Sequence, residues 1–503
     1  MRSQGSAELY EVRLDRTSGT PLFRQIYRQV RSAVLSGVLG PDTKLPATRA
    51  MASKLRVARA SVVAAYEQLL AEGYVEGRRG SGTFVSTDFI DHGGSPRLRA
   101  ARRVVKPRPL PGPAQAFAEF ERPTARTEGR PFNTGRTLIN ARTAEIWRML
   151  TRRAARSLES CDLGYTDPCG LIELRRTICD YLRVARAVRC DPEQIVVTAG
   201  AQHAIDIAIR VILTPGDEVW VEDPGYPLTH ALLLLAKTRP HPIPVDAQGI
   251  DVGLGRRAAP TARAVFVTPS HQFPTGVVLS MARRLELLAW ARASGAFIIE
   301  DDYTSEFRYS APPLASLQGL DEDARVIYVG TLNKALFPGL RIGYAVVPNA
   351  LLPAFANARY LMDRQPPTLY QKVVAAFMEQ GHFAAHIRRT RQMYREQRDA
   401  LAVTLAHRAA DHLEVTVPDQ GMHLVAYLND GISDTEIESA ALRAGIIVRA
   451  TSRFYQSASP RPGLMLGFSG FPRQLIVPAA ERLAALVASA SPGASAVSPH
   501  RPE

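Results

Sequence analysis

The stretch GTLNKALFPGLRIGY, residues 330–344, decides how the C-terminal part of this chain is interpreted. It follows the apolar run 326–329, which predicts a buried strand, and its single lysine is Lys334. A lysine at a strand end is usually an ordinary surface residue. It can also be an amine that captures a carbonyl group, with Arg341 seven residues later as a clamp for a phosphate. The stretch by itself leaves both interpretations open.

Short apolar runs alternate with helical stretches throughout residues 131–492. The runs lie at 195–198, 218–221, 264–268, 296–299, 326–329 and 343–347. This alternation predicts an α/β domain in which helices cover both faces of a mostly parallel sheet. Ligands bind at the carboxyl ends of the strands in such domains. Residues that bind a ligand are therefore expected in the loops that follow these runs.

Two further loops carry suggestive residues. Small residues at 200–202 open a predicted helix, where backbone N–H groups can approach a phosphate. Residues 300–303 read Glu-Asp-Asp-Tyr, and three adjacent carboxylates repel one another unless a protonated ring nitrogen, a structural arginine or a metal faces them. Together with Lys334 and Arg341, these loops supply the cradle, ring partner, amine and clamp that pyridoxal phosphate requires.

Residues 20–88 show a helix-turn-helix pattern. Apolar residues repeat every four positions over 22–34, a short helix begins at Pro46, and a third helix follows from Arg59. The apolar stripe of the third helix is expected at Val62, Tyr66 and Leu70. Two short strands around an arginine-bearing turn are predicted over 73–85. The pattern is that of a winged helix, whose third helix enters a major groove while wing arginines meet phosphate.

The net charge of +14 is concentrated at the N-terminal end. Residues 1–88 hold 13 Lys and Arg against 8 Asp and Glu, and residues 89–130 hold 9 against 4. This asymmetry indicates an anionic partner, with nucleic acid the leading candidate. Residues 89–130 also contain six prolines, which predicts an extended linker whose charge either follows DNA or only aids solubility. The tail 493–503 is expected to be disordered.

Membrane, secretion and metal functions find no support in the sequence. No apolar run approaches the roughly 20 residues of a membrane helix, and the N-terminus lacks the apolar core of a signal peptide. The four cysteines form no C-x-x-C pair, so neither a zinc site nor a disulfide framework is predicted. We expect a cytoplasmic protein that joins the nucleoid through DNA binding.

Several strings carry a family resemblance. Residues 45–85 resemble the winged helix of GntR-family repressors. The strings YTDPCG, TAGAQHA, EDPGYP, TPSHQFPTG, EDDYTSEFRY and GTLNKALFPGLRIGY resemble, in the same order, the fold-type I aminotransferase-like domain of the MocR/GabR regulators. The resemblance covers roughly residues 20–485. It implies a winged helix (20–88), a basic linker (89–130) and an aminotransferase-like domain (131–492) with large and small subdomains.

The resemblance also implies roles for individual residues in cofactor binding. Lys334 would hold pyridoxal 5'-phosphate as an internal aldimine, and Asp301 would pair with the pyridinium nitrogen. The remaining cofactor contacts would be Tyr303 to the ring oxygen, and Gly200, Ala201, Gln202, Thr331 and Arg341 to the phosphate. Tyr165 would reach the phosphate in the neighbouring subunit, which implies a homodimer with shared sites. On double-stranded DNA, the candidate contacts are Arg49, Arg59, Ser61, Arg78 and Arg79.

Some positions depart from the family pattern. Before the third helix, Arg56 and Ala58 stand where the family has glycine and serine, which removes a turn glycine and an N-cap worth about 1 kcal/mol. Asn333 replaces the usual serine beside Lys334. Ordinary aminotransferases have an asparagine where Phe273 stands here, as is typical of the regulators. His271 and Gln272 are candidates to compensate for it, or are structural.

The most informative departure is Met465. Aminotransferases place an arginine in an R-L-S-F-A-like string to grip the substrate carboxylate, and the matching string here begins with Met465. A methionine cannot hold a carboxylate, which argues against a general amino-acid transaminase. Arg449 and Arg453, in a neighbouring loop, are candidates to substitute for the arginine. Without such a substitution two alternatives remain open: a sensor of pyridoxal phosphate itself, as in the PdxR-like branch, or an effector held differently.

The expected function is therefore a dimeric transcriptional regulator. It would couple pyridoxal phosphate, or an amino-compound effector bound at Lys334, to operator binding. The alternative is a working aminotransferase with a DNA-binding head, for which a slow half-reaction is the minimum expectation. A domain that has lost its cofactor and serves only to dimerise is disfavoured because Lys334, Asp301 and Arg341 are all present.

Overall fold

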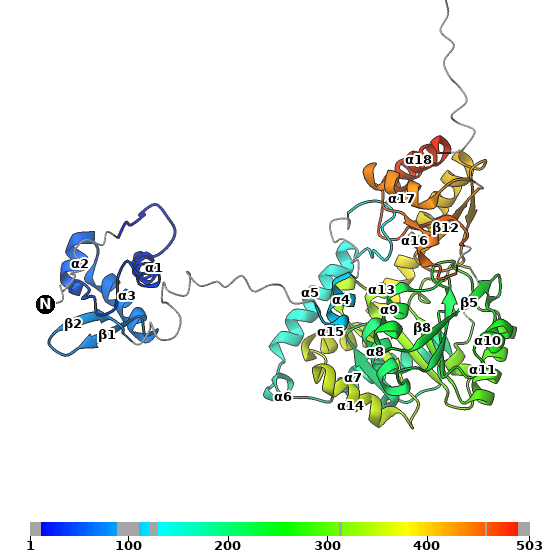
Figure 1. Cartoon of the computed structure of the whole chain (residues 1–503), viewed down its shortest axis with the longest axis horizontal. Helices are drawn as coiled ribbons and strands as arrows, with labels where there is room; N and C mark the ends of the chain where they lie inside the picture. The colour runs from blue at the N-terminus through cyan, green and yellow to red at the C-terminus, as the bar shows by residue number, and fades with distance from the viewer. Residues whose placement is uncertain are drawn as a thin grey trace, which may run out of the picture. The chain divides into compact units, whose positions relative to one another are not determined.

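The computed structural model describes residues 12–87, 110–119, 129–310, 314–429, 431–457 and 460–490. The chain divides into two compact units, Met1–Glu119 and Phe120–Glu503, each described by itself (Figure 1). Most of the predicted linker and all of the predicted tail lie outside the described residues. Within the linker the structure has one helix, α4 (Gly112–Glu119), which the sequence analysis did not expect.

The first unit has the predicted order of helices and strands. Its elements are α1 (Leu22–Leu35), α2 (Thr48–Leu55), α3 (Arg59–Ala71), β1 (Val75–Arg78) and β2 (Gly82–Val85). The two strands pair antiparallel from Val75 opposite Val85 to Arg78 opposite Gly82, and form the wing. The stripe predicted on α3 was wrong at one position. Leu69 is buried, whereas Leu70 is 40% exposed, because a stripe through Val62 and Tyr66 continues at a spacing of three.

An extended N-terminal arm is attached to α1 by two glutamine side chains. The Gln29 amide donates to the carbonyl oxygen of Arg13 at 2.6 Å and accepts from its N–H at 2.9 Å. The Gln25 amide makes the same pair of bonds with Asp15, at 2.8 and 2.9 Å. Each glutamine thus continues the arm's backbone hydrogen bonding, which fixes residues 13–15 along α1.

The turn between α2 and α3 receives support from this arm. Arg56 lies in the left-handed region at φ 52°, and Ala58 caps α3 without a side-chain hydrogen bond. Both features carry the cost expected from the missing glycine and serine. Arg16 partly offsets it, because its Nη2 donates to the carbonyl oxygen of Arg56 at 2.8 Å.

The second unit contains a large α/β sheet, as predicted. Its order is β3-β10-β9-β8-β7-β4-β5-β6, with β10 and β6 antiparallel to their neighbours and the other strands parallel. The strands are β3 (Ile195–Thr198), β4 (Glu218–Asp223), β5 (Arg239–Asp246), β6 (Gly249–Ile250), β7 (Ala264–Val267), β8 (Phe297–Asp302), β9 (Val326–Thr331) and β10 (Gly343–Val346). All six predicted strands are present.

Strand β5 was missed because its sequence, RPHPIPVD, carries prolines at 240, 242 and 244. A proline has no N–H to donate, which normally excludes it from a sheet interior. Here the prolines alternate, so their missing donors share one edge of the strand. The two-residue β6 pairs only with Val245 and Asp246, so most of that edge needs no partner strand.

Helices cover both faces of the large sheet (Figure 1). One face packs on α8 (Ala201–Ile212) and α14 (Leu352–Asp363). The other packs on α7 (Ile172–Arg186), α10 (Val252–Ala258), α11 (Met281–Ser294) and α15 (Thr368–Glu379). The helices α5 (Ala141–Arg156), α6 (Ser160–Leu163), α9 (Pro227–Leu235), α12 (Leu317–Leu320) and α13 (Leu332–Ala335) complete this part. Side chains that alternate along one strand therefore reach two different environments.

A smaller antiparallel sheet follows, in the order β11-β12-β14-β13. Its strands are β11 (Leu413–Thr416), β12 (His423–Leu428), β13 (Arg449–Ala450) and β14 (Gly463–Gly467), and its helices are α16 (His382–Arg408), α17 (Asp434–Arg443) and α18 (Arg473–Ser489). One face, with Leu424 and Leu466, packs in the core with these helices. The alternate residues form the opposite face, which we call the His423 face: His423, Val425, Tyr427, Arg449, Gly463, Met465 and Gly467.

None of the helices in the described part of the chain combines the length and the apolarity that crossing a bilayer requires.

Candidate functional site

The three carboxylates at the end of β8 are divided between the two faces of the sheet. Glu300 accepts hydrogen bonds from the N–H groups of Leu317 and Gln318, both at 3.0 Å. Asp302 accepts from Arg186 Nε at 2.7 Å and lies on the same face. Asp301 points to the opposite face and accepts no hydrogen bond from the described residues, its Oδ1 being shielded from solvent. Of the alternatives left open by the sequence, a structural arginine pairs with Asp302, whereas Asp301 has no hydrogen-bond partner among the described residues.

Burial and the neighbouring Asp302 carboxylate raise the pKa of Asp301 to about 7, and Lys334 opposes the shift. Lys334 lies on α13, the short helix after β9, and is half-buried. Burial is the main cause that lowers the pKa of the Lys334 amine, with Arg341 adding to it, while Asp301 raises it. The two groups thus influence each other's charge. A lysine with a lowered pKa has more neutral amine, the form that attacks carbonyl groups.

Gly135 lies against the Lys334 amine, a contact that sequence reasoning missed. A Cβ atom on Gly135 would collide with Lys334 Nζ and displace the end of the lysine side chain, and the backbone φ of 77° would strain any residue larger than glycine. Nearly 200 residues separate the two positions, and the segment 129–140 shows no strand or helix periodicity. No sequence pattern could have found this contact.

The predicted phosphate cradle is assembled at the start of α8. Gly200 caps the helix at φ 102°, and a Cβ there would lie 2.9 Å from Asn333 Nδ2 and 3.1 Å from Arg341 Nη2. Arg341 Nη2 donates to the carbonyl oxygen of Ala199 at 2.5 Å. Thr331 accepts from the Asn333 N–H at 3.2 Å. The positive end of α8, a guanidinium and an amide therefore meet in one place, which suits an anion.

Several polar atoms around this place are shielded from solvent but have no hydrogen-bond partner among the described residues. They include Asp301 Oδ1, the Tyr303 hydroxyl and Gln202 Oε1. Buried polar groups are normally paired, so such a cluster indicates a missing ligand. An acidic oxygen, a phenol, an amine and an anion cradle match the ring nitrogen, ring oxygen, aldehyde and phosphate of pyridoxal phosphate. The residues present therefore fit this cofactor.

Phe273 belongs to an aromatic cluster beside these polar groups. Its ring centroid lies 5.2 Å from both Tyr226 and Phe454 and 6.4 Å from Tyr303. Gln272 is used structurally, because its Nε2 donates to the Pro224 carbonyl oxygen at 2.7 Å. Gln272 therefore does not compensate for the absent asparagine.

His271 is buried, and its ring lies 4.8 Å from His423 and 6.1 Å from Tyr303. Neither ring nitrogen has a partner among the described residues. Burial holds the pKa of His271 well below its usual value. His271 therefore remains a candidate neutral contact to a ring oxygen.

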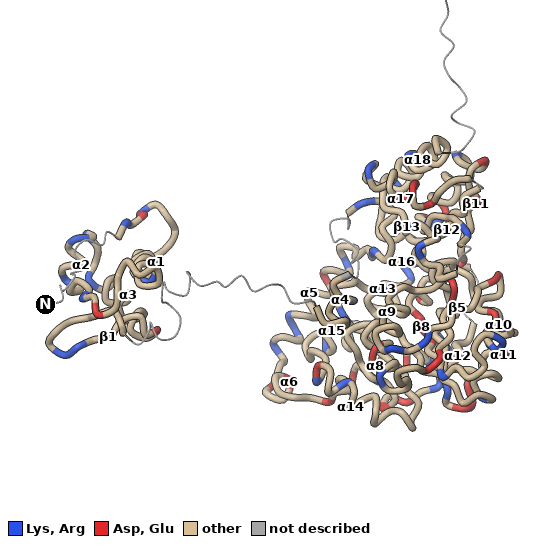
Figure 2. Tube along the Cα trace, viewed as in Figure 1, with Lys and Arg blue, Asp and Glu red and all other residues tan. Residues whose placement is uncertain are grey.

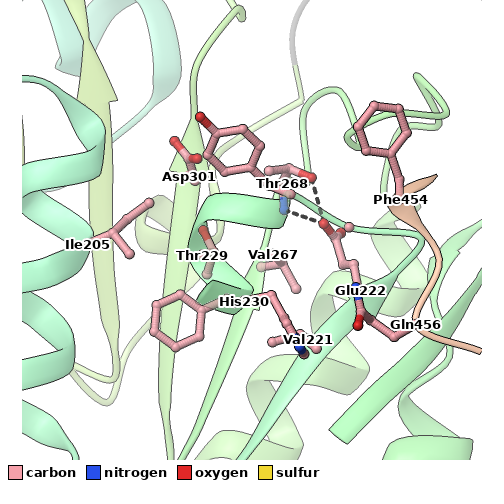
Figure 3. Close-up of a pocket in the computed structure, with 13 residues that line it drawn as sticks. Ile205, Val221, Glu222, Thr229, His230, Val267, Thr268, Asp301, Phe454 and Gln456 are labelled. Atoms are coloured by element: carbon pink, nitrogen blue, oxygen red, sulfur yellow. Dashed lines mark hydrogen bonds between the residues drawn. The ribbon is translucent and has the colours of Figure 1, made fainter. Parts of the chain in front are cut away.

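A pocket opens next to Asp301 between the ends of β4, β7 and β8 (Figure 3). Glu222 lies in its wall, and its Oε2 accepts from the Thr268 hydroxyl at 2.6 Å and the Thr268 N–H at 3.2 Å. Burial raises the pKa of Glu222 to about 7 in spite of these bonds. The wall also includes Ile205, Thr229, His230, Phe266, Phe454 and Gln456.

Tyr165 is not enclosed with the other predicted residues. It is 80% exposed, and the Arg364 guanidinium lies over its ring at 4.7 Å. An exposed tyrosine at this position is compatible with a contact to another subunit, and that role stays a prediction.

The predicted DNA contacts in the first unit differ in their availability. Arg49, Arg59 and Arg79 are exposed, and Arg59 Nε donates to Thr48 Oγ1 at 3.3 Å. Arg78 is bound within the wing by Asp42 at 2.6 Å and Glu76 at 2.7 Å. Ser61 is half-buried on α3. Lys and Arg gather at the wing turn and around α2 (Figure 2).

Both units match known families. The family described as bacterial regulatory proteins, gntR family, matches residues 22–85, and aminotransferase class I and II matches residues 131–464. The chain is 37% identical to the probable rhizopine catabolism regulatory protein MocR of Rhizobium meliloti, over 91% of this chain and 92% of that protein. It is 31% identical to the pyridoxine biosynthesis transcriptional regulator PdxR of Corynebacterium glutamicum, over 89% and 92%.

Solved structures resemble the second unit. An archaeal alanine:glyoxylate aminotransferase gives a TM-score of 0.69 at 25% identity, over 76% of this chain and 98% of that chain. An α-aminoadipate aminotransferase of Thermus thermophilus, complexed with N-(5'-phosphopyridoxyl)-L-leucine, gives 0.68 at 25% identity, over 75% and 97%. Relatives with this fold therefore include a protein solved with a derivative of the cofactor.

A GntR-type winged helix joined to a class I/II aminotransferase domain defines a class of transcriptional regulators. The chain belongs to the MocR/GabR subfamily of that class. The match to regulators along nine tenths of the chain supports the regulator over the alternative of an aminotransferase with a DNA-binding head.

Proposed function

We propose that this regulator binds operator DNA through its winged helix and changes that binding when pyridoxal phosphate, or an amine that reacts with it, occupies the Lys334 site. The observation that carries the proposal is the convergence of Lys334, the unpaired Asp301 and the Gly200–Arg341 cradle. When bound, pyridoxal phosphate supplies an aldehyde that reacts reversibly with primary amines and a ring that absorbs visible light.

The chain's own residues have distinct tasks in this proposal. Lys334 presents its amine from a half-buried position, with its pKa lowered so that the neutral form is accessible. Asp301 holds a negative charge opposite the ring nitrogen. Arg341 and the first N–H groups of α8 hold the phosphate. Tyr165 contributes from the partner subunit of a homodimer.

In the winged helix, α3 lies in the major groove, with Arg59 and Ser61 near its first turn and Arg49 on α2 beside it. Arg79 at the wing turn meets the phosphate backbone. Phosphate neutralisation by these side chains makes the affinity fall steeply with salt.

The test uses the full chain and DNA from upstream of its own gene and the neighbouring genes. Visible absorption is recorded as pyridoxal phosphate is added, and operator binding is measured by fluorescence anisotropy with and without the cofactor at fixed salt. Lys334→Ala is expected to lose the visible band entirely and to lose the cofactor's effect on the anisotropy curve. Arg292→Ala, which removes an exposed ion pair between α11 and Asp323, is the matched control and should behave as the unaltered protein.

A visible band that persists in Lys334→Ala would mean that another lysine reacts, and the proposed site would be wrong. A band without any change in operator affinity would make the cofactor a fixed prosthetic group, and the signal would then have to be an amine that displaces Lys334.

A further inference from the structure

Helix α5 carries an excess of arginine that the proposed function does not use. Its 16 residues include one acidic side chain, Glu145, and five arginines, which are Arg142, Arg148, Arg152, Arg153 and Arg156. All five arginines are exposed, and none forms an ion pair or a side-chain hydrogen bond with a residue of the described ranges. A surface that serves only solubility mixes charges of both signs, so this excess indicates an anionic partner.

The arginines of α11 show the usual situation of this side chain in the same unit. Arg283 pairs with Asp246 at 2.8 Å, and Arg292 pairs with Asp323 at 2.5 Å. Arg284 donates to three backbone carbonyl oxygens. Every arginine of α11 therefore has a partner inside the protein, whereas the arginines of α5 have none in the part of the chain that the structure describes.

Three of the arginines form a ridge along the solvent side of α5. Leu150 and Ala154 bury the opposite side of the helix in the core. Arg148, Arg152 and Arg156 repeat every four residues, so they lie one above the other and about 6 Å apart along the helix axis. We call these three residues the α5 ridge. The helix backbone fixes their spacing before any ligand binds.

The positive surface continues onto α16. The Thr143 hydroxyl and His386 Nδ1 lie 3.2 Å apart, which joins the first turn of α5 to the beginning of α16. Arg388 and Arg389 follow His386; both are exposed, and neither has an ion pair among the described residues. In Figure 2, blue segments of Lys and Arg follow one another along α5. The surface is thus larger than a single helix.

Double-stranded DNA is the anionic partner that this surface fits. Guanidinium groups bind phosphate oxygens with two parallel hydrogen bonds. The α5 ridge spans about 12 Å, and consecutive phosphates of one DNA strand follow at about 3.4 Å along the duplex axis, so the ridge matches several phosphates. The chain also carries the GntR-type winged helix, and DNA bound there is present at a high local concentration for α5.

We infer that the α5 ridge contacts the phosphate backbone of the DNA that flanks the operator. This inference rests on the proposed function, because the winged helix delivers the DNA. It gives the aminotransferase-like unit a DNA-binding surface of its own, which adds affinity without reading base sequence.

The experiment compares two DNA fragments and two triple variants of the full chain. The short fragment is limited to the operator, and the long fragment carries the same operator with flanking DNA on both sides. The ridge variant is Arg148→Gln with Arg152→Gln and Arg156→Gln, since glutamine keeps the helix propensity. The control variant removes three arginines that already have exposed ion pairs, by Arg210→Gln, Arg292→Gln and Arg408→Gln.

Fluorescence anisotropy at several salt concentrations measures the affinities. The unaltered protein and the control variant should bind the long fragment more tightly than the short one. The ridge variant should bind the short fragment as the unaltered protein does and should bind the long fragment roughly 10-fold more weakly at low salt. On the long fragment, its slope of log affinity against log salt should fall by about three for each subunit that contacts the DNA.

Two outcomes would overturn the inference. One is an equal affinity of the ridge and control variants for the long fragment. The other is a ridge variant that sediments as a smaller species than the unaltered protein, because the arginines would then belong to a subunit interface.

A different result would remove the proposed function: an unaltered protein that binds the operator no more tightly than unrelated DNA of the same length. The α5 ridge is still tested in that case, because phosphate contacts need no operator sequence. The ridge variant should then bind long unrelated DNA more weakly than the control variant, and equal binding would overturn the inference.

Discussion

Asp301 and Asp302 are neighbours on one strand and have opposite roles in the structure. Asp302 is fully buried and receives hydrogen bonds from Arg186 at 2.7 Å and from the Tyr328 hydroxyl at 2.6 Å. Asp301 points to the other face of β8, towards α8 and Lys334, and no described residue bonds it. The alternation of the strand gives one carboxylate to the fold and leaves the next one for a ligand.

This difference shows that the absence of a partner inside the protein, rather than the charge itself, indicates which side chain can contact a ligand. The same contrast separates Arg79 from Arg78 in the wing and Arg449 from Arg453 near the small sheet. In each pair one side chain is occupied inside the protein and the other is available. The experiments below test these contrasts.

The largest effect is expected at Arg186. Arg186→Ala leaves Asp302 buried without its cation, which should lower the free energy of unfolding by about 3–5 kcal/mol. Tryptophan fluorescence in urea reports this unit, since the chain's three tryptophans, at 147, 220 and 290, all lie in it. Arg210→Ala removes an exposed i,i+4 pair with Asp206 and should cost less than about 1 kcal/mol.

A double variant completes this test. Arg186→Met with Asp302→Leu removes the whole pair and should recover much of the loss. A double variant as unstable as Arg186→Ala would show that packing, and not the unpaired charge, sets the cost.

In contrast to Arg186→Ala, Asp301→Asn should weaken cofactor binding without lowering the stability of the fold. The unfolding free energy of the cofactor-free protein should stay the same or rise, because a carboxyl whose pKa is raised to about 7 gains little from its surroundings. The affinity for pyridoxal phosphate should fall about 10- to 100-fold with the loss of a charge-assisted bond. Titration of the visible band measures it. An unchanged affinity would contradict the pairing of Asp301 with the ring.

The pH dependence of the free energy of unfolding should differ between the unaltered protein and Asp301→Asn. Since the folded pKa of Asp301 lies above its ordinary value, its contribution to stability is fully present below about pH 4 and is lost as pH rises through 7. Asp301→Asn, which cannot titrate, should therefore gain stability over the unaltered protein across this interval, by at most about 1.4 kcal/mol per pH unit. Urea unfolding of the cofactor-free proteins between pH 5 and 8 measures it, and a constant difference would refute it.

A smaller effect is expected in the wing. Arg79→Ala should reduce the slope of log affinity for operator DNA against log salt by about one, because one phosphate contact is lost. Arg78→Ala should change the slope less, since its charge is already offset by Asp42 and Glu76. Anisotropy titrations at several salt concentrations distinguish the two. Equal slopes would mean that the wing ion pairs open on DNA.

The smallest effects are expected at the turn before α3. Arg56→Gly and Ala58→Ser should each stabilise α2 and α3 by about 1 kcal/mol, by relieving φ 52° and by adding an N-cap. Arg16→Ala should act in the opposite direction, because it removes the bond to the Arg56 carbonyl oxygen. Amide hydrogen exchange of α2 and α3 in the full chain measures all three. Faster exchange in Arg56→Gly would mean that the arginine itself supports the turn.

Local sequence patterns were sufficient for much of the fold. Period-two and period-four apolar patterns located six strands of the large sheet and the three helices of the winged helix, because they depend on which side chains are buried. The apolar patterns gave a wrong or missing prediction at two places. Alternating prolines concealed β5, and a stripe read at a spacing of four selected Leu70 instead of Leu69.

The candidate site divides in the same way. From local patterns, the candidates were Lys334, the carboxylates 300–302, the 200–202 turn and Arg341, since each lies at or after the end of a recognisable strand; the family resemblance then selected Asp301 among the three carboxylates. The contacts of the folded chain were needed to show that Asp302 pairs with Arg186, that Gly135 lies against Lys334, and that Arg453 pairs with Glu438 while Arg449 has no partner among the described residues. Hydrogen bonding and burial depend on contacts between segments that are distant in the sequence. The local spacing of residues carries no information about such contacts.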